Sequence, residues 1–216
     1  MKSLLQKRKI FLNKGFTLVE LLITLSIFAV TTGIVMFSQN KFDNSVLLTN
    51  LAYDMAITIR QAQAYGVNVK EHILLNGQGS FNPYGVYFSA SDSTHYLMFS
   101  DTIGGQNSKG DFLYNSKDMS CPTTDSECVN RYALKRGDHI VSFCTGANET
   151  ACDQQIIGGQ IDSLRILFKR PEPDAKIFVG EDTFTSLGYA KITVSSADGN
   201  SKRSVVVTNT GQIYVK

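Results

Sequence analysis

The chain begins with a polar, basic segment that is followed directly by a long run of apolar residues. The run extends from Phe16 to Phe37, and Glu20 is the only ionisable residue within its twenty-two positions. An α-helix of that length extends about 33 Å, which suffices to cross a hydrocarbon layer of about 30 Å. The pattern therefore predicts a membrane-spanning helix over residues 16–37.

An amphipathic pattern follows this run over residues 38–66. Apolar residues recur at intervals of three and four positions, and polar residues take the opposite face. No proline occurs before Pro83, and Gly66 is the predicted helix stop. We predict a single helix from about Phe16 to about Tyr65, with Gly33 as its weakest point. The apolar stripe consists of Leu48, Leu51, Met55, Ile59 and Ala62, and the polar face of Asn50, Asp54, Thr58 and Gln61.

Residues 67–216 have a β pattern and form the predicted globular domain. Turn sequences around Gly199 and Gly211 each separate two alternating runs, as expected for hairpins. The predicted fold class is α+β, with the outer half of a long N-terminal helix packed against an antiparallel β-sheet domain. The predicted strands are Val67–Leu75, Gly85–Ser89, Tyr96–Ser100, His139–Phe143, Ser163–Lys169, Lys176–Val179, Ala190–Ser195, Ser204–Thr208 and Gln212–Val215.

A polar stretch over residues 101–138 is predicted to be a loop, within an excursion over 101–152 that contains all the cysteines. Cys121, Cys128, Cys144 and Cys152 are even in number and clustered, which favours two disulfides and an oxidising, exported location. Their spacings are looser than the pairs that structural zinc usually takes. Short loops favour Cys121–Cys128 with Cys144–Cys152, although the two other pairings stay open. Any adhesive or partner specificity is expected in this excursion.

The positive charge of the chain is concentrated at its N-terminus. The first fifteen residues contain five lysines or arginines and no acid, so without them the side-chain charge changes from +2 to −3. By the positive-inside rule this leader lies in the cytoplasm and the remainder lies outside. The remainder has no strongly cationic segment of the kind that nucleic acid requires. Three basic pairs, Lys135-Arg136, Lys169-Arg170 and Lys202-Arg203, would favour DNA binding only if they converged on one face.

The sequence KGFTLVE, Lys14 to Glu20, joins the leader to the apolar run. A secretory signal peptide is cut after its apolar segment, whereas here the only suitable processing point lies before it. This arrangement resembles the prepilins of type IV pili and the pseudopilins of type II secretion and competence systems. The resemblance implies that a prepilin peptidase cuts between Gly15 and Phe16 and methylates the new amino group of Phe16. Residues 1–15 would then be the leader peptide.

Glu20 is the second functional residue that this resemblance indicates. A carboxylate within a membrane helix costs roughly 2.5–3.5 kcal/mol and usually has a partner. In a filament, Glu20 of one subunit can meet the amino group of Phe16 in a neighbour, which would neutralise both charges and fix the axial register. The alternative is that Glu20 merely extends toward the membrane surface near the start of the helix.

A second, fainter resemblance concerns both ends of the globular part. Residues 52–66 and 204–215 are similar to the helix end and the terminal hairpin of pseudopilin H and of FimT-like minor pilins. The resemblance implies a structural subunit, a minor pilin or pseudopilin, of a pilus-like or secretion-like filament. Its expected partners are prepilin peptidase, other pilin subunits and an assembly platform in the bacterial inner membrane. The mature protein would be located there first, and then in an extracellular pilus or periplasmic pseudopilus.

The sequence contains no residue pattern that indicates catalysis. His72, His95 and His139 are scattered, and no nucleophile elbow, phosphate loop or dinucleotide fingerprint is present. Turn chemistry explains Asp198-Gly199-Asn200 more simply than a calcium site does. We therefore expect no enzyme activity, cofactor or metal. Two alternative functions remain open, a pilin that binds DNA during uptake and a binding domain anchored outside the membrane by one helix.

Overall fold

The computed structural model of the chain describes residues 15–68, 70–73, 77, 79–102, 110–116, 119–121, 127–156 and 162–216, with the side chains of 37–43 and 152–156 left out. Residues 1–14 of the predicted leader lie outside this description. The chain forms two compact units, Met1–Asp43 and Asn44–Lys216, and each is described by itself.

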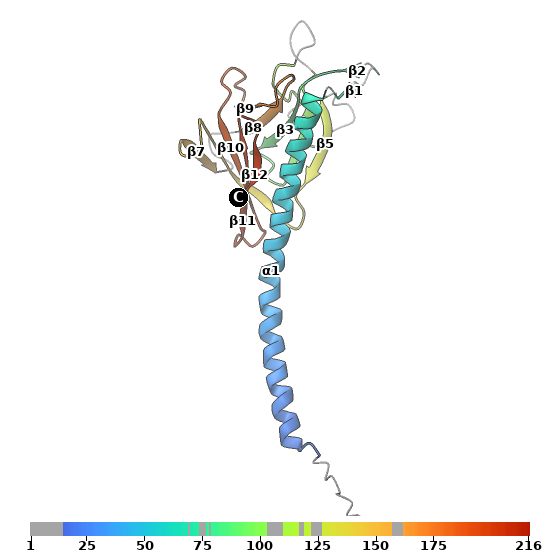
Figure 1. Cartoon of the computed structure of the whole chain (residues 1–216), viewed down its shortest axis with the longest axis vertical. Coiled ribbons are helices and arrows are strands. Elements are labelled where there is room, and N and C mark those ends of the chain that lie inside the picture. Colours follow the sequence, from blue (N-terminus) through green and yellow to red (C-terminus); the bar gives the residue numbers. More distant parts are fainter. Residues whose placement is uncertain are drawn as a thin grey trace, which may run out of the picture. The chain divides into compact units, whose positions relative to one another are not determined.

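One long helix, α1, runs from Leu18 to Val67 (Figure 1). Its bounds differ from the predicted ones by two residues at each end, which is within the usual variation of helix ends. The helix continues through Gly33, so the predicted weak point does not interrupt it. Residues 44–67 of α1 belong to the second unit and form part of its core.

Twelve strands are described in the second unit, and all their pairings are antiparallel. Every strand predicted from Gly85 onward is present, with bounds shifted by one to three residues. The α+β class predicted from the sequence is confirmed. The strands are β1 (His72–Ile73), β2 (Gly79–Ser80), β3 (Tyr84–Ser89), β4 (His95–Ser100), β5 (Cys128–Ala133), β6 (His139–Gly146), β7 (Cys152–Ile156), β8 (Ser163–Phe168), β9 (Ala175–Val179), β10 (Tyr189–Ser195), β11 (Lys202–Thr208) and β12 (Ile213–Val215).

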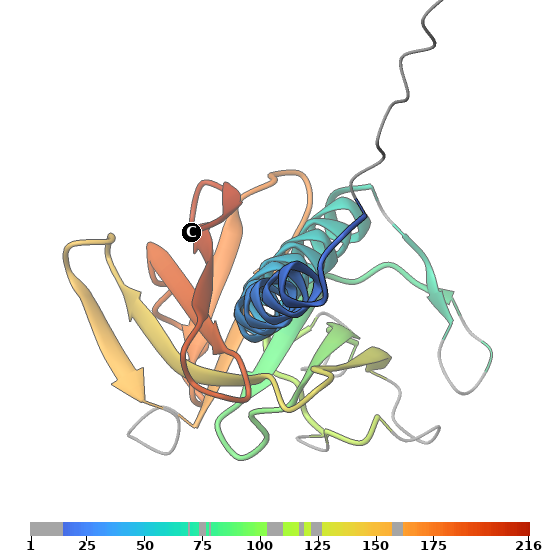
Figure 2. The same cartoon turned by 90° about the horizontal axis from the view of Figure 1, so that it is seen from below.

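These strands form two five-stranded sheets and one small hairpin. Sheet I has the order β5-β4-β3-β8-β9, and sheet II has the order β12-β11-β10-β6-β7. The hairpin pairs β1 with β2. Each sheet contains one central pairing between strands far apart in the sequence, β3 with β8 and β6 with β10. Figure 2 shows residues 44–67 of α1 beside both sheets.

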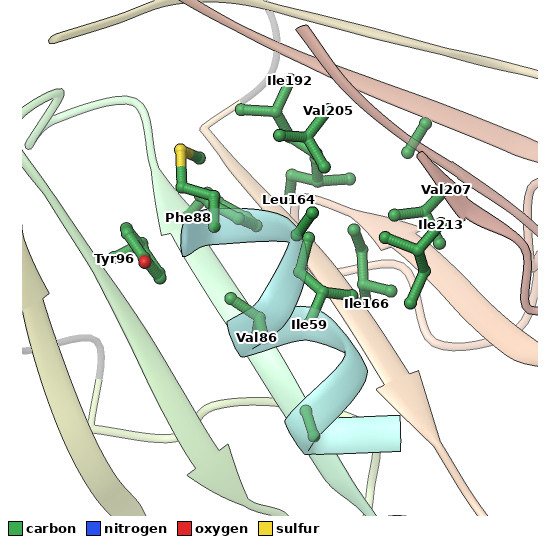
Figure 3. Close-up of a cluster of buried hydrophobic side chains, with 14 of the residues drawn as sticks. Ile59, Val86, Phe88, Tyr96, Leu164, Ile166, Ile192, Val205, Val207 and Ile213 are labelled. Atoms are coloured by element: carbon green, nitrogen blue, oxygen red, sulfur yellow. The ribbon is translucent and has the colours of Figure 1, made fainter. Parts of the chain in front are cut away.

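The main core is formed where the two sheets and residues 48–62 of α1 meet. The helix contributes Leu48, Met55 and Ile59, all of which are fully buried. Small residues between them, Ala52, Ala56 and Ala62, let the helix approach the sheets closely. Figure 3 shows Ile59 among side chains of both sheets, which are Val86, Phe88, Tyr96, Leu164 and Ile166 from sheet I and Ile192, Val205, Val207 and Ile213 from sheet II.

Sheet I is also covered on its opposite face. A second apolar cluster lies there and includes Leu97, Phe99 and Leu167. Tyr114 and Met119, which come from the excursion, belong to the same cluster. Strands β3 and β8 are consequently buried at every position. Residues 110–116 and 119–121 of the excursion, which we call the lid segment, therefore cover the outer face of sheet I.

Several sequence predictions are wrong in detail. Residues 128–133 were expected in a loop, but they form the edge strand β5, whose alternation is obscured by polar side chains. The predicted strand Val67–Leu75 is too long, because α1 continues to Val67 and the described β1 holds two residues. Thr58 was assigned to the polar face of the helix, yet it is buried, and its hydroxyl lies 3.3 Å from the hydroxyl of Tyr96.

Gly66 does not stop the helix but allows a close contact between α1 and β8. A Cβ atom at this position would lie 2.3 Å from the carbonyl oxygen of Phe168. No real Cβ atom tolerates that distance to a backbone atom, so the helix and the strand would have to separate. The position therefore requires glycine because of packing, and α1 ends one residue later.

We predict that Gly66→Ala lowers the free energy of unfolding of the detergent-solubilised chain by about 1–3 kcal/mol, because the added methyl group overpacks this contact. Gly33→Ala is the matched control, since a Cβ there meets nothing within 4 Å and alanine favours a helix. Urea unfolding followed by circular dichroism measures both. A Gly66→Ala protein as stable as the Gly33→Ala protein would contradict the packing account.

Candidate processing and assembly site

The predicted processing point lies in exposed, non-helical backbone immediately before α1. Gly15, Phe16 and Thr17 are all exposed, and none of them belongs to a helix or strand. A Cβ atom on Gly15 would meet nothing within 4 Å. The fold therefore gives no steric reason for glycine at this position.

Thr17 begins the helix by capping it. Its Oγ1 accepts a hydrogen bond from the backbone N–H of Glu20 at 3.2 Å, and its carbonyl accepts the N–H of Leu21. This is the usual arrangement of a helix N-cap, with Glu20 at the third helical position. The spacing threonine-x-x-glutamate before an apolar run is the sequence signal of such a cap, so the role of Thr17 was predictable although it was not predicted.

Glu20 is the only ionisable side chain described between Gly15 and Met36. It lies in the first turn of α1, where a negative charge interacts favourably with the helix dipole. Its carboxylate is exposed and has no hydrogen-bond or ion-pair partner among the described residues. The helix dipole thus explains part of the preference for an acid here, but it does not supply a counter-charge.

The apolar residues of the same segment are not covered by any described part of the chain. Leu18–Met36 is the one segment of the described residues that is long and apolar enough to cross a membrane. Its large apolar side chains are each more than half exposed, among them Leu22, Ile27 and Phe28. The hydroxyl groups of Thr24, Ser26, Thr31 and Thr32 donate to carbonyl oxygens of the preceding turn.

Because these hydroxyls are satisfied within the helix, the segment presents an almost entirely apolar surface. The carboxylate of Glu20 is the exception. An apolar surface of this size requires lipid or other protein to cover it. Phe37 and the six residues after it complete the connection to the second unit, but their side chains are not described.

The cysteines are placed in two regions of the second unit. Cys121 and Cys128 form a disulfide with Cα atoms 5.5 Å apart, which attaches the lid segment to the start of β5. Cys144 on β6 is also disulfide-bonded. The side chain of Cys152 lies outside the described residues, so the second half of the predicted pairing remains a prediction.

Two buried carboxylates that were not predicted from the sequence hold the lid segment in place. Asp101 accepts the backbone N–H groups of Asp111 and Phe112, both at 3.0 Å. Glu127 accepts the backbone N–H groups of Thr102 at 3.2 Å and of Asn115 at 2.7 Å. Both acids are fully buried, and they lie at the end of β4 and the start of β5. No sequence pattern distinguishes them from the other polar residues of the excursion.

Burial raises the pKa of Asp101 to about 7. The N–H of Phe112 opposes this shift, and the negative charges of Asp111 and Glu127 add to it. The folded protein therefore retains a proton on Asp101 at pH values where the unfolded chain has lost it.

Arg165 on β8 lies beneath the same lid. Its guanidinium donates to the carbonyl oxygens of Phe112, Gly180 and Asp182 at 2.6–2.8 Å, and burial lowers its pKa. Together with Tyr87 it lines a cavity of about 240 Å³ on the outer face of sheet I. The arginine fixes the lid and the loop after β9 onto the sheet.

The described histidines are not brought together. His95 Nδ1 lies 2.8 Å from Asp92 Oδ2 within one turn, whereas His139 Nδ1 lies beside the carbonyl oxygen of Gly137. No group of three potential metal-ligating side chains is found in the described ranges. In the turn after β10, Asp198 accepts the N–H of Asn200, and Gly199 has a φ of 72°, as hairpin chemistry requires.

Two of the three basic pairs converge. Arg136 Nη2 donates to Asn44 Oδ1 at 3.1 Å, and Arg203 Nε donates to Thr49 Oγ1 at 3.0 Å, so both pairs lie beside residues 44–49 of α1. The third pair, Lys169-Arg170, follows Phe168, whose carbonyl faces Gly66 at the opposite end of this part of the helix.

Residues 11–36 match the family described as the prokaryotic N-terminal methylation motif. The match includes Gly15, Phe16 and Glu20 and ends within α1, so it covers none of the second unit. No curated protein and no solved structure matches the chain. The motif supports a type IV pilin-like protein, and with the exposed apolar helix it fits membrane anchoring.

We predict that the chain becomes less stable as the pH rises from about 4 to about 7, because the folded state holds a proton on Asp101 that the unfolded state has released. This difference contributes on the order of 4 kcal/mol at the acidic end of the window and is lost as the pH approaches 7. Urea unfolding at several pH values measures it.

Asp101→Asn should reduce this pH dependence, since the amide does not titrate. Asp162→Asn, a change at an exposed position, is the control and should retain the wild-type slope. Equal slopes for the wild-type and Asp101→Asn proteins would show that Asp101 is not the titrating group.

Proposed function

We propose that the chain is a structural subunit, a minor pilin or pseudopilin, of a type IV pilus-like or type II secretion-like filament. The observation that carries this proposal is the exposed apolar surface of Leu18–Met36, which contains one carboxylate and directly follows the methylation motif. A surface of this kind serves as a membrane anchor in lipid and as an assembly interface between subunits outside it.

Processing would occur between Gly15 and Phe16. A peptidase binds its substrate in an accessible and extended form, and these residues are exposed and outside the helix. Since the fold does not require glycine at position 15, recognition by the processing enzyme accounts for it better than packing does. We infer that prepilin peptidase removes the leader and that Phe16 receives the methyl group.

The precursor would lie in the bacterial inner membrane with the second unit outside. The basic leader favours this orientation. The disulfide between Cys121 and Cys128 agrees with it, because disulfides persist in oxidising compartments outside the cytoplasm. From there an assembly platform would transfer the subunit into an extracellular pilus or a periplasmic pseudopilus.

Assembly would follow from the change in what surrounds the apolar helix. Aliphatic helices gain little by associating in lipid, where the acyl chains are as apolar as they are. Once the helix leaves the membrane, its exposed side chains gain roughly 25 cal/mol for each Å² removed from water. Packing against the corresponding helices of other subunits supplies that burial.

Glu20 would set the register of this packing. Its carboxylate has no partner in the described chain, and the new amino group of Phe16 would be a second uncompensated charge. An ion pair between Glu20 of one subunit and Phe16 of its neighbour neutralises both charges within an apolar assembly. Leaving either charge unpaired there would be strongly unfavourable.

We predict that Glu20→Ala reduces incorporation into filaments by about tenfold or more, because each assembled subunit would then leave an unpaired amino group in an apolar surrounding. Quantitative immunoblotting of sheared filaments and membranes measures the incorporated fraction. Ser26→Ala, an exposed change in the same segment, is the control.

Thr17→Ala distinguishes this effect from a loss of helix capping. It removes the cap, which is worth about 1 kcal/mol, and leaves Glu20 in place. If Glu20→Ala assembles as well as the wild type, or no worse than Thr17→Ala, the ion pair is not what directs assembly.

A further inference from the structure

The turn between β5 and β6 and the turn between β10 and β11 touch each other in the second unit. A Cβ atom on Gly137, in the first turn, would lie 2.9 Å from the Cβ of Ala197 in the second. The absence of a Cβ on Gly137 permits this close approach, and its φ of 81° lies in the left-handed region that favours glycine. Lys135-Arg136 in the first turn and Lys202-Arg203 at the start of β11 are thereby brought to the same end of the unit.

The arginine of each pair is fixed to α1 near the start of this unit. Arg136 donates to the side chain of Asn44. Arg203 donates to the hydroxyls of Thr49 and Ser45, at 3.0 and 3.2 Å respectively. All these acceptors are neutral oxygens, so the hydrogen bonds position the guanidinium groups without compensating their charge.

The lysines of the two pairs add two exposed charges at the same place. We call Lys135, Arg136, Lys202 and Arg203 the basic cluster; none of the four takes part in an ion pair with a described residue. Two acids lie in the same turns, but Asp138 is largely buried. Asp198 is engaged with Ser196 and Asn200 in its own turn. Four basic side chains against these two carboxylates leave a net charge of +2.

The chain connects this cluster closely to the apolar segment. Asn44, which Arg136 contacts, is only eight residues after Met36, the last residue of the candidate membrane span. Eight residues bridge at most about 28 Å, whatever the conformation between the two units. A headgroup layer adds several Å beyond the hydrocarbon on each side, so the cluster is within reach of it.

We propose that the basic cluster binds anionic phospholipid headgroups of the membrane that Leu18–Met36 crosses, and so holds the second unit against the outer surface until assembly. This inference rests on the proposed membrane anchoring. Phosphate oxygens suit arginine and lysine donors, and clusters of basic residues beside a membrane span are attracted to anionic lipid by about 1 kcal/mol per residue.

Nucleic acid fits the cluster less well. Residues 134–139 and 195–203 contain no phenylalanine, tyrosine or tryptophan on which a base could stack, and His139 is their only aromatic ring. The third basic pair lies at the other end of the helix segment, so the cluster does not extend into a track along which a nucleic-acid backbone could lie.

The test uses the full chain in lipid nanodiscs, either of neutral phosphatidylcholine or with about a third replaced by anionic phosphatidylglycerol. Hydrogen exchange of the amides in residues 135–137 and 198–203 is compared between the two. We expect slower exchange in the anionic discs, and we expect salt to remove the difference. Replacing Lys135 and Lys202 with glutamine should weaken docking about fivefold for each lysine removed.

Arg170→Gln with Lys176→Gln is the matched control, since it removes two exposed charges elsewhere in the unit. Equal exchange in both lipids, or equal effects of the two double variants, would overturn the proposal. If duplex DNA added to neutral discs protects the same turns, the cluster is a nucleic-acid site instead. Failure of the chain to insert into neutral discs would contradict the proposed membrane anchoring, which is a separate claim from the docking of the basic cluster.

Discussion

The packing of residues 48–62 of α1 between the two sheets is the contact on which the second unit depends. Leu48, Met55 and Ile59 fill a core to which both sheets contribute, and the alanines between them allow close approach. Gly66 extends the same contact to the backbone of β8. A truncated or displaced helix would leave the inner faces of both sheets exposed to water, so this helix is an integral part of the globular fold.

The N-terminal part of the same helix has the opposite property. Its hydroxyl groups are satisfied locally, its apolar side chains are exposed, and its single carboxylate lacks a partner among the described residues. Such a segment is stable only with external partners, first lipid and then other subunits in the proposed account. The chain thus combines a unit that has a buried core with a segment whose apolar surface no described residue covers.

The sequence predicted the helix, most strands and the methylation motif because each depends on local patterns. The apolar run of residues 16–37 and the apolar stripe that follows it predict α1. The residues around Gly15 form the methylation motif. Edge strand β5 was not predicted because its exposed residues, such as Asn130 and Arg131, hide the alternation. The roles of Asp101, Glu127 and Arg165 depend on contacts with residues distant in the sequence, which no local pattern reveals. Likewise, only the fold shows that two of the three basic pairs converge.

The most direct test of the account is intact mass and N-terminal sequencing of the protein from its native membrane or from sheared filaments. We expect a chain that starts at Phe16, is heavier by one methyl group, and lacks the four hydrogen atoms that two disulfides remove. A chain that starts at Met1, or one cut after the apolar run, would contradict it, because the segment proposed for anchoring and assembly would then be unprocessed or lost.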